Sequence, residues 1–105
     1  RMCLVGHSSG GHLCALAALA VETTGLVGVA TLNAPFDVAE HYAYEQQRGV
    51  ADVSPLYPAF GGDMRSLAAL SPTRILWDLG PGCASKLPAF FIGHGTKDHS
   101  VPCTQ

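Results

Sequence analysis

The chain has 105 residues, of which 48% are apolar and 13% are charged, and its formal net charge is −2. This length suits a single domain, and this balance favours a packed core over a disordered chain. The six basic residues are scattered. No basic stripe is present to neutralise phosphates, which argues against nucleic-acid binding. No apolar run reaches the ~18 residues that a membrane-spanning helix needs.

The first third of the chain predicts a βαβ unit. Residues 2–5 form an uninterrupted apolar run, which is typical of a parallel strand covered on both faces. Four apolar side chains then recur at helical spacing, namely Leu13, Leu16, Ala17 and Ala20. They predict a helix over 9–23 that ends at Gly25. Residues 26–32 are again apolar and β-branched, so the two strands should be parallel.

The stretch 36–72 interrupts this alternation of strands and helices. Asp37, Asp63 and Ser71 each precede a segment that favours a helix, and they predict three N-caps. A third buried strand is predicted at 88–92. Because the stretch joins two strands, we interpret it as a helical, lid-like insertion over the ends of the strands.

Residues 6–10 read G-H-S-S-G and match the G-x-S-x-G pattern of a nucleophile elbow. In an elbow, a serine at a sharp strand-to-helix turn has a strained backbone and an exposed hydroxyl, and the two glycines relieve local crowding. The predicted strand and helix flank the motif as required. Ser8 is therefore the candidate nucleophile, and the N–H of Ser9 is a candidate oxyanion-hole donor. A phosphate-binding turn is the alternative, but neither G-x-G-x-x-G nor a P-loop is present.

Asp98 is the candidate acid of a catalytic triad. It follows the third predicted strand, at the edge of the sheet where α/β proteins present functional side chains. A serine followed by an acid is also the chain order of the hydrolase triad. The alternative for Asp98 is a turn aspartate that bonds its own backbone. Asp37 is a rival acid, although a role as helix cap explains it.

No histidine is well placed to serve as the base. His99 adjoins Asp98, so the two side chains should diverge, and His94 is expected to pack at the exit of the strand. The others lie near the elbow or on the insertion: His7, His12 and His41. We therefore expect the base beyond Gln105. A metal site built from His94, Asp98 and His99 matches no familiar ligand spacing.

The four cysteines show neither zinc-ligand spacing nor a disulfide framework. They are Cys3, Cys14, Cys83 and Cys103. We expect them to be buried free thiols, which weakly favours an intracellular location.

Two motifs resemble a known family. Residues 6–13, GHSSGGHL, resemble the GHSAGGHL elbow of the esterase/lipase branch of the α/β-hydrolase superfamily. Residues 94–102, HGTKDHSVP, resemble the HGxxDxxVP acid loop of the same branch. Stretches at 47–50, 53–55 and 70–72 are similar to isoprenylcysteine methylesterase-like carboxylesterases, so the resemblance covers nearly the whole chain.

This resemblance implies a partial α/β-hydrolase fold, with a mostly parallel sheet and a lid-like insertion at about 36–72. It implies Ser8 as nucleophile, Asp98 as triad acid and the Ser9 N–H as oxyanion donor. The triad histidine and a second oxyanion loop would lie outside residues 1–105. We therefore expect an internal fragment that is itself inactive.

The implied activity is hydrolysis of a small carboxylic ester through an acyl-enzyme, without metal or organic cofactor. The ester would carry an apolar acyl or prenyl group. Four aromatic residues of the insertion either line its pocket or simply pack: Tyr42, Tyr44, Tyr57 and Phe60. Two alternatives remain open, an arylformamidase-type amidase and a non-catalytic, hydrolase-like binding protein.

Overall fold

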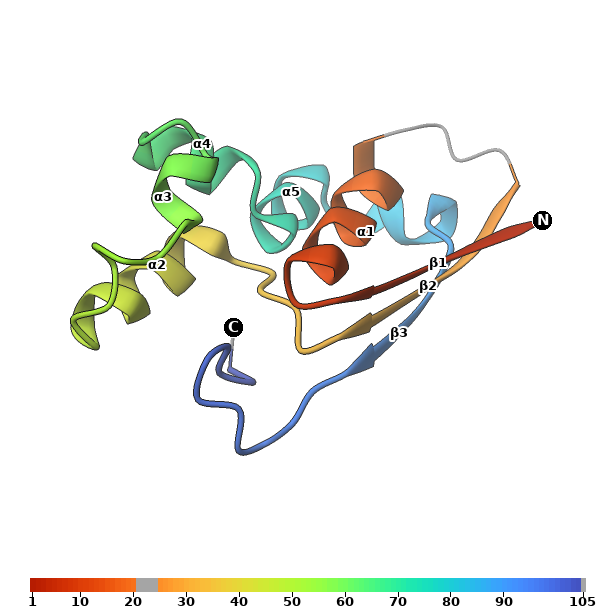
Figure 1. Ribbon diagram of the computed structural model, residues 1–105. Coiled ribbons are helices and arrows are strands. Elements are labelled where there is room, and N and C mark those ends of the chain that lie inside the picture. Colours follow the sequence, from red (N-terminus) through yellow and green to blue (C-terminus); the bar gives the residue numbers. More distant parts are fainter. Residues whose placement is uncertain (21–24, 105) are drawn as a thin grey trace.

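The computed structural model describes residues 1–20 and 25–104. It is an α/β fold with an open, all-parallel sheet of three strands in the order β1-β2-β3 (Figure 1). The strands are β1 (Met2–His7), β2 (Leu26–Leu32) and β3 (Ala89–Gly93). The predicted parallel βαβ unit and the predicted third strand are thus confirmed.

Helix α1 (Ser9–Ala20) follows β1 directly. The remaining helices are α2 (Val38–Gln47), α3 (Leu56–Ala59), α4 (Met64–Ala69), α5 (Pro72–Leu79) and the 3₁₀ helix η1 (Pro81–Lys86). The predicted end of the first helix at residue 23 lies outside the described residues. In the described ranges, no helix has both the length and the apolar character needed to cross a membrane.

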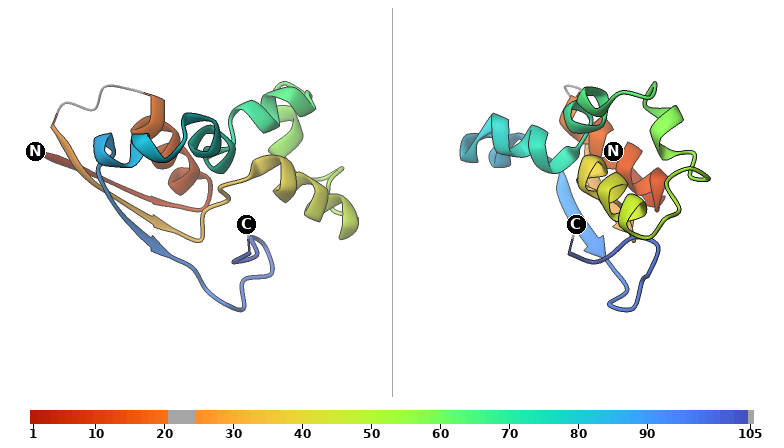
Figure 2. Two further views of the ribbon diagram at one scale, coloured as in Figure 1. Left: turned by 180° about the vertical axis from the view of Figure 1, so that it is seen from behind. Right: turned by 90° about the vertical axis from the view of Figure 1, so that its left-hand side faces the viewer.

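Helices α1 and α5 pack side by side over one face of the sheet (Figure 2). Ala18 of α1 packs against Leu26 and Val29 of β2, and all three are buried. Ala15 is buried too, whereas Leu13 is exposed. The predicted apolar face of this helix is therefore wrong by about half a turn, because small alanines rather than leucines lie against the strands.

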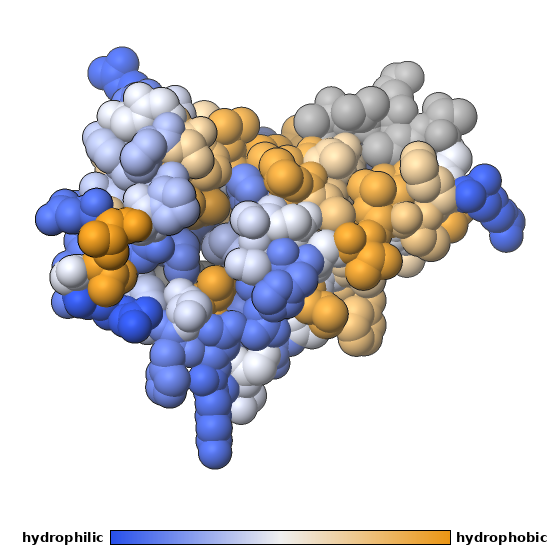
Figure 3. Space-filling view, viewed as in Figure 1, coloured by the Kyte–Doolittle hydropathy of each residue, from blue (hydrophilic) through white to orange (hydrophobic). Residues whose placement is uncertain are grey.

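The opposite face of the sheet is bare. Cys3 is exposed there, Val5 is 72% exposed and Phe91 is 64% exposed. Apolar surface accordingly gathers over the half of the molecule that carries the strands and α1, whereas the loop after β3 is hydrophilic (Figure 3). The predictions of strands covered on both faces, and of a buried third strand, are wrong for the described residues, since no described element packs on this face.

The helical segment (residues 36–72) has a core of its own, in which Val38, Ala39 and Leu67 are buried. Asp37 caps α2 by accepting a hydrogen bond from the Glu40 N–H at 2.9 Å, as predicted. Asp63 caps α4 through the N–H groups at 65 and 66, also as predicted.

Ser71 occupies the N-cap position of α5, but its side chain does not cap that helix. Its hydroxyl instead accepts from the Val38 N–H at 3.0 Å and donates to the Leu67 carbonyl at 2.8 Å. Ser71 thus joins the start of α2 to the end of α4. The predicted cap is wrong because these two backbone groups, one of them 33 residues away, bind the hydroxyl.

Candidate active site

The elbow (residues 6–10) has the strand–turn–helix geometry that its motif predicts. Ser8 lies between β1 and α1 with φ of +53°, a left-handed backbone conformation that residues other than glycine rarely adopt. Its N–H donates to the Leu32 carbonyl at 2.9 Å, which joins the turn to β2. Non-glycine residues in this conformation cluster at functional sites.

Only one of the two motif glycines is explained by crowding. A Cβ at Gly6 would overlap the carbonyl group of Gly10, so this position requires glycine. A Cβ at Gly10 would meet nothing within 4 Å, contrary to the sequence-based argument. The second crowded position is Gly11, where a Cβ would lie 2.6 Å from the Ala34 Cβ. The prediction that crowding requires both motif glycines is therefore correct for Gly6 and wrong for Gly10.

The Ser8 hydroxyl has no hydrogen-bond partner among the described residues, and the side chain is half-buried. Ser9 is exposed and is the first residue of α1. The first N–H groups of a helix have no intrahelical acceptor, and the helix dipole favours negative charge at this end. The turn thus presents a hydroxyl beside backbone donors.

Asp98 lies in the acid loop (residues 94–102), which follows β3. Its Oδ1 accepts from the N–H groups of Ser100 at 2.8 Å and Val101 at 3.0 Å. Its Oδ2 accepts from the side-chain amide of Asn33 at 2.5 Å. The two backbone bonds are those of a turn aspartate, the alternative considered for this residue, but the Asn33 bond comes from a different strand.

These bonds favour the ionised carboxylate of Asp98. The Val101 N–H, then the Asn33 amide and then the Ser100 N–H lower the pKa of this group to about 2, against a small opposing effect of burial. Asp98 is therefore an anion over the whole physiological pH range. It can accept one more hydrogen bond at Oδ2, as a triad acid must from the histidine it orients.

Hydrogen bonds within the acid loop and from helix α2 hold the loop in place. Nε2 of His94 hydrogen-bonds the Val101 carbonyl at 2.7 Å and closes the loop on itself. The His99 carbonyl accepts from the Tyr44 hydroxyl at 2.8 Å and from Arg48 Nη1 at 2.6 Å. Helix α2 therefore contacts the loop that carries the acid.

The parallel topology brings three polar side chains to one edge of the sheet. Ser8 follows β1, Asn33 follows β2 and Asp98 lies in the loop after β3. Because the strands are parallel, their carboxyl ends share this edge, where α/β proteins bind ligands. The sequence predicted Ser8 and Asp98 as site residues but not Asn33.

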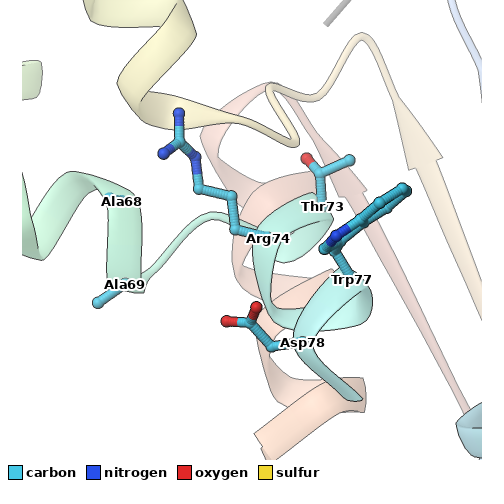
Figure 4. Close-up of a pocket in the computed structure, with 6 residues that line it drawn as sticks. All are labelled: Ala68, Ala69, Thr73, Arg74, Trp77 and Asp78. Atoms are coloured by element: carbon cyan, nitrogen blue, oxygen red, sulfur yellow. The ribbon is translucent and has the colours of Figure 1, made fainter. Parts of the chain in front are cut away.

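The rival acid, Asp37, is used within the helical segment. Besides capping α2, it forms an ion pair with Arg74, whose Nε lies 2.8 Å from Oδ2. Burial raises the pKa of Asp37, but the hydrogen bonds and charge of its partners outweigh this effect and lower the pKa overall. Figure 4 shows Arg74 reaching from α5 toward the turn before α2. These contacts agree with a structural role.

His12 joins α1 to the helical segment. It is 5% exposed, and its Nε2 donates to the Leu70 carbonyl at 2.8 Å. Its ring also packs edge-on against Phe60, with centroids 5.8 Å apart. Burial lowers the pKa of His12 below 6.5, although the Leu70 bond opposes this shift. This bond ties the ring to the helical segment, and no hydrogen bond joins the ring to Ser8 or Asp98 in the described residues.

Two further histidines are also bound, whereas His7 and His99 are exposed. His94 is bound within the acid loop, and His41 lies 3.6 Å from Glu45 on α2. In the described parts of the chain, no three histidine, cysteine or acidic side chains form a group that could hold a metal ion.

The aromatic residues of the helical segment pack on one another or bind the acid loop. Tyr42 stacks on Tyr57 with centroids 4.8 Å apart, and both lie against the core of the segment together with Phe60. Tyr44 is bound to the acid loop. A hollow beside α5, drawn in Figure 4, is lined by Ala68, Ala69, Thr73, Arg74, Trp77 and Asp78, and thus by neither Ser8 nor Asp98.

All four cysteines are free, as predicted. None of them is fully buried, however, so that part of the prediction is wrong. Cys14 and Cys83 are half-buried, whereas Cys3 is exposed on the bare face of the sheet and Cys103 is exposed after the acid loop.

No protein-family model matches the chain, and neither the curated proteins nor the solved structures contain a match. We therefore infer function from the geometry of Ser8, Asn33 and Asp98.

Proposed function

We propose that this chain is part of a serine hydrolase of the α/β-hydrolase type that cleaves carboxylic esters through an acyl-enzyme. One observation carries the proposal. Ser8 stands in a left-handed turn between β1 and α1 with an unbonded hydroxyl, at the sheet edge that also carries the Asp98 carboxylate. A strained turn, a nucleophile with an unbonded hydroxyl and an ionised acid are what acyl transfer by a triad requires.

In the proposed reaction, the Ser8 hydroxyl attacks the carbonyl carbon of the ester while a histidine from outside residues 1–105 takes its proton. The oxyanion is stabilised by the Ser9 N–H and by the N-terminus of α1. The histidine then protonates the departing alcohol, and water hydrolyses the acyl group from Ser8. Asp98 orients the histidine and stabilises its charged form. Neither a metal nor an organic cofactor takes part.

The helical segment would lie over this site as a lid. Two contacts support that position, namely the His12–Leu70 bond beside the elbow and the bonds from α2 to the acid loop. The resemblance implies a pocket for an apolar acyl or prenyl group. The aromatic residues give no support for such a pocket, since they pack within the helical segment. We therefore propose the bond that is cleaved, an ester, rather than a particular acyl chain.

A non-catalytic binding protein is the second candidate. One observation favours it. The rings of His12 and His94 are both bound to backbone carbonyls, so neither ring binds Asp98. A catalytic protein needs a base from elsewhere, whereas a binding protein needs none.

Turnover by the full-length protein that contains this chain separates the candidates. We expect hydrolysis of p-nitrophenyl acetate that Ser8→Ala abolishes. Ser9→Ala is the matched control and should keep wild-type rates, because Ser9 contributes only its backbone N–H. Asp98→Asn should slow turnover about 10³–10⁴-fold. Absence of turnover favours the binding protein, and faster cleavage of formanilides than of esters favours the amidase.

A further inference from the structure

We propose that Asn33 is a positioning residue that holds the catalytic carboxylate of Asp98 in place from the neighbouring strand. This inference rests on the proposed function, since it assigns the part that Asn33 plays in the same site. The hydrogen bonds of the Asn33 side chain go to Asp98 and Gly95, not to Ser8, so Asn33 acts through Asp98.

The side chain of Asn33 joins two strand ends. Its amide nitrogen donates to Asp98 Oδ2, and its amide oxygen accepts from the Gly95 N–H at 3.3 Å. Only this orientation of the amide satisfies both partners, because an N–H group donates and a carboxylate accepts. Asn33 therefore binds the acid and the start of the acid loop at the same time.

The backbone of Asn33 is as constrained as its side chain. Its φ is +50°, and Ser8 is the other non-glycine residue with positive φ in the described parts of the chain. Its N–H donates to the Gly93 carbonyl at 2.9 Å, at the end of β3. The two strained residues thus follow neighbouring strands at one edge of the sheet, as strained residues at functional sites do.

A simple turn asparagine does not explain these contacts. Such residues bond their own backbone about two residues on. The partners of the Asn33 side chain are 62 and 65 residues away in sequence. The amide also leaves the second lone pair of Oδ2 free for an incoming histidine, so it aligns the carboxylate without occupying it.

Two variants of the full-length protein separate the side chain of Asn33 from its backbone. Asn33→Gly removes the amide but tolerates positive φ. Asn33→Asp keeps the size and also tolerates this conformation, but it places a second carboxylate against Asp98. We expect kcat for p-nitrophenyl acetate to fall about 10- to 100-fold in Asn33→Gly, as for other misplaced catalytic groups. The loss should be larger in Asn33→Asp, and KM should be unchanged in both.

The decisive comparison repeats both variants in an Asp98→Ala background. Because Asn33 acts through Asp98, neither substitution should change the residual turnover more than about twofold there. A merely structural Asn33 would lower turnover equally in both backgrounds, and this result would overturn the inference. Wild-type kcat in both single variants would overturn it as well, while leaving the proposed function intact. If Ser8→Ala loses turnover while both Asn33 variants keep wild-type turnover, only the inference about Asn33 fails and the proposed function stands.

Discussion

The carboxyl edge of the sheet and the helical segment are held in place by different interactions. At the edge, backbone conformation dominates, with positive φ at Ser8 and Asn33 and no room for a side chain at Gly6. In the helical segment, a few buried polar side chains join elements that are far apart in sequence. Ser71 connects α2 to α4, and His12 connects α1 to the residue after α4.

This difference teaches where each kind of substitution should act. A backbone constraint cannot be relieved by moving a side chain, so substitutions at the carboxyl edge of the sheet should destroy the site. A side-chain hydrogen bond can be replaced in part by water. Substitutions in the helical segment should therefore lower the stability of the fold while the elbow keeps its conformation.

Substitution of the elbow glycines should give the largest effect. Gly6→Ala places a Cβ into the Gly10 carbonyl group, and we expect a loss of about 3 kcal/mol in unfolding free energy together with loss of turnover. Gly10→Ala is the matched control, because its Cβ meets open space and alanine favours a helix by up to about 1 kcal/mol. Thermal unfolding measures both, and equal behaviour of the two variants would remove the crowding argument.

Ser71→Ala should give the next largest effect. The variant leaves the Val38 N–H and the Leu67 carbonyl without their partner, which costs about 1–3 kcal/mol in unfolding free energy. Ser85→Ala removes an exposed serine with one weak bond of 3.4 Å and should change stability by less than about 0.5 kcal/mol. A stable Ser71→Ala protein would show that the helical segment is not held by this hydroxyl.

Acidification should loosen the helical segment before the sheet edge. Burial lowers the pKa of His12 from 6.5, so the folded chain prefers the neutral ring. Its contribution to stability is therefore complete above pH 6.5 and is lost as pH falls below that value. Hydrogen exchange in residues 60–70, corrected for intrinsic rates, should be faster at pH 5 than at pH 7. This difference should disappear in His12→Gln, and its persistence there would assign it to another group.

Asp98 should not respond over that range. Its pKa of about 2 lies below the usual 3.8, so its loop contacts are fully favourable above pH 3.8 and weaken only as pH falls toward 2. An NMR titration of the Asp98 carboxyl should place its midpoint near 2. A midpoint at 3.8 would mean that the loop bonds are absent in solution.

The ion pair of Arg74 with Asp37 should give the smallest effect. The Arg74 side chain is 48% exposed, and the Asp37 cap bond to Glu40 remains without it. Arg74→Ala should therefore cost about 0–1 kcal/mol in unfolding free energy. Arg65→Ala, at another exposed arginine, is the control. A larger cost would mean that charge pairs, as well as Ser71, hold the segment.

Local sequence patterns predicted the local structure. The strands, the elbow turn and the caps at Asp37 and Asp63 all depend on residues within a few positions of one another. The role of Asn33 was missed because its side-chain partners lie more than 60 residues away. The role of Ser71 was missed because it depends on the Val38 N–H, which lies 33 residues away. The bare face of the sheet was missed for a similar reason, since an apolar run does not show what covers it.

The most direct test of Ser8 as the nucleophile is the site of a covalent adduct. The full-length protein is treated with a fluorophosphonate, digested and mapped by mass spectrometry, with Ser8→Ala and Ser9→Ala treated alike. We expect a single adduct on Ser8 in the wild type and in Ser9→Ala, and none in Ser8→Ala. An unmodified Ser8 in the wild type, or equal labelling of Ser8→Ala at another residue, would contradict the proposed function.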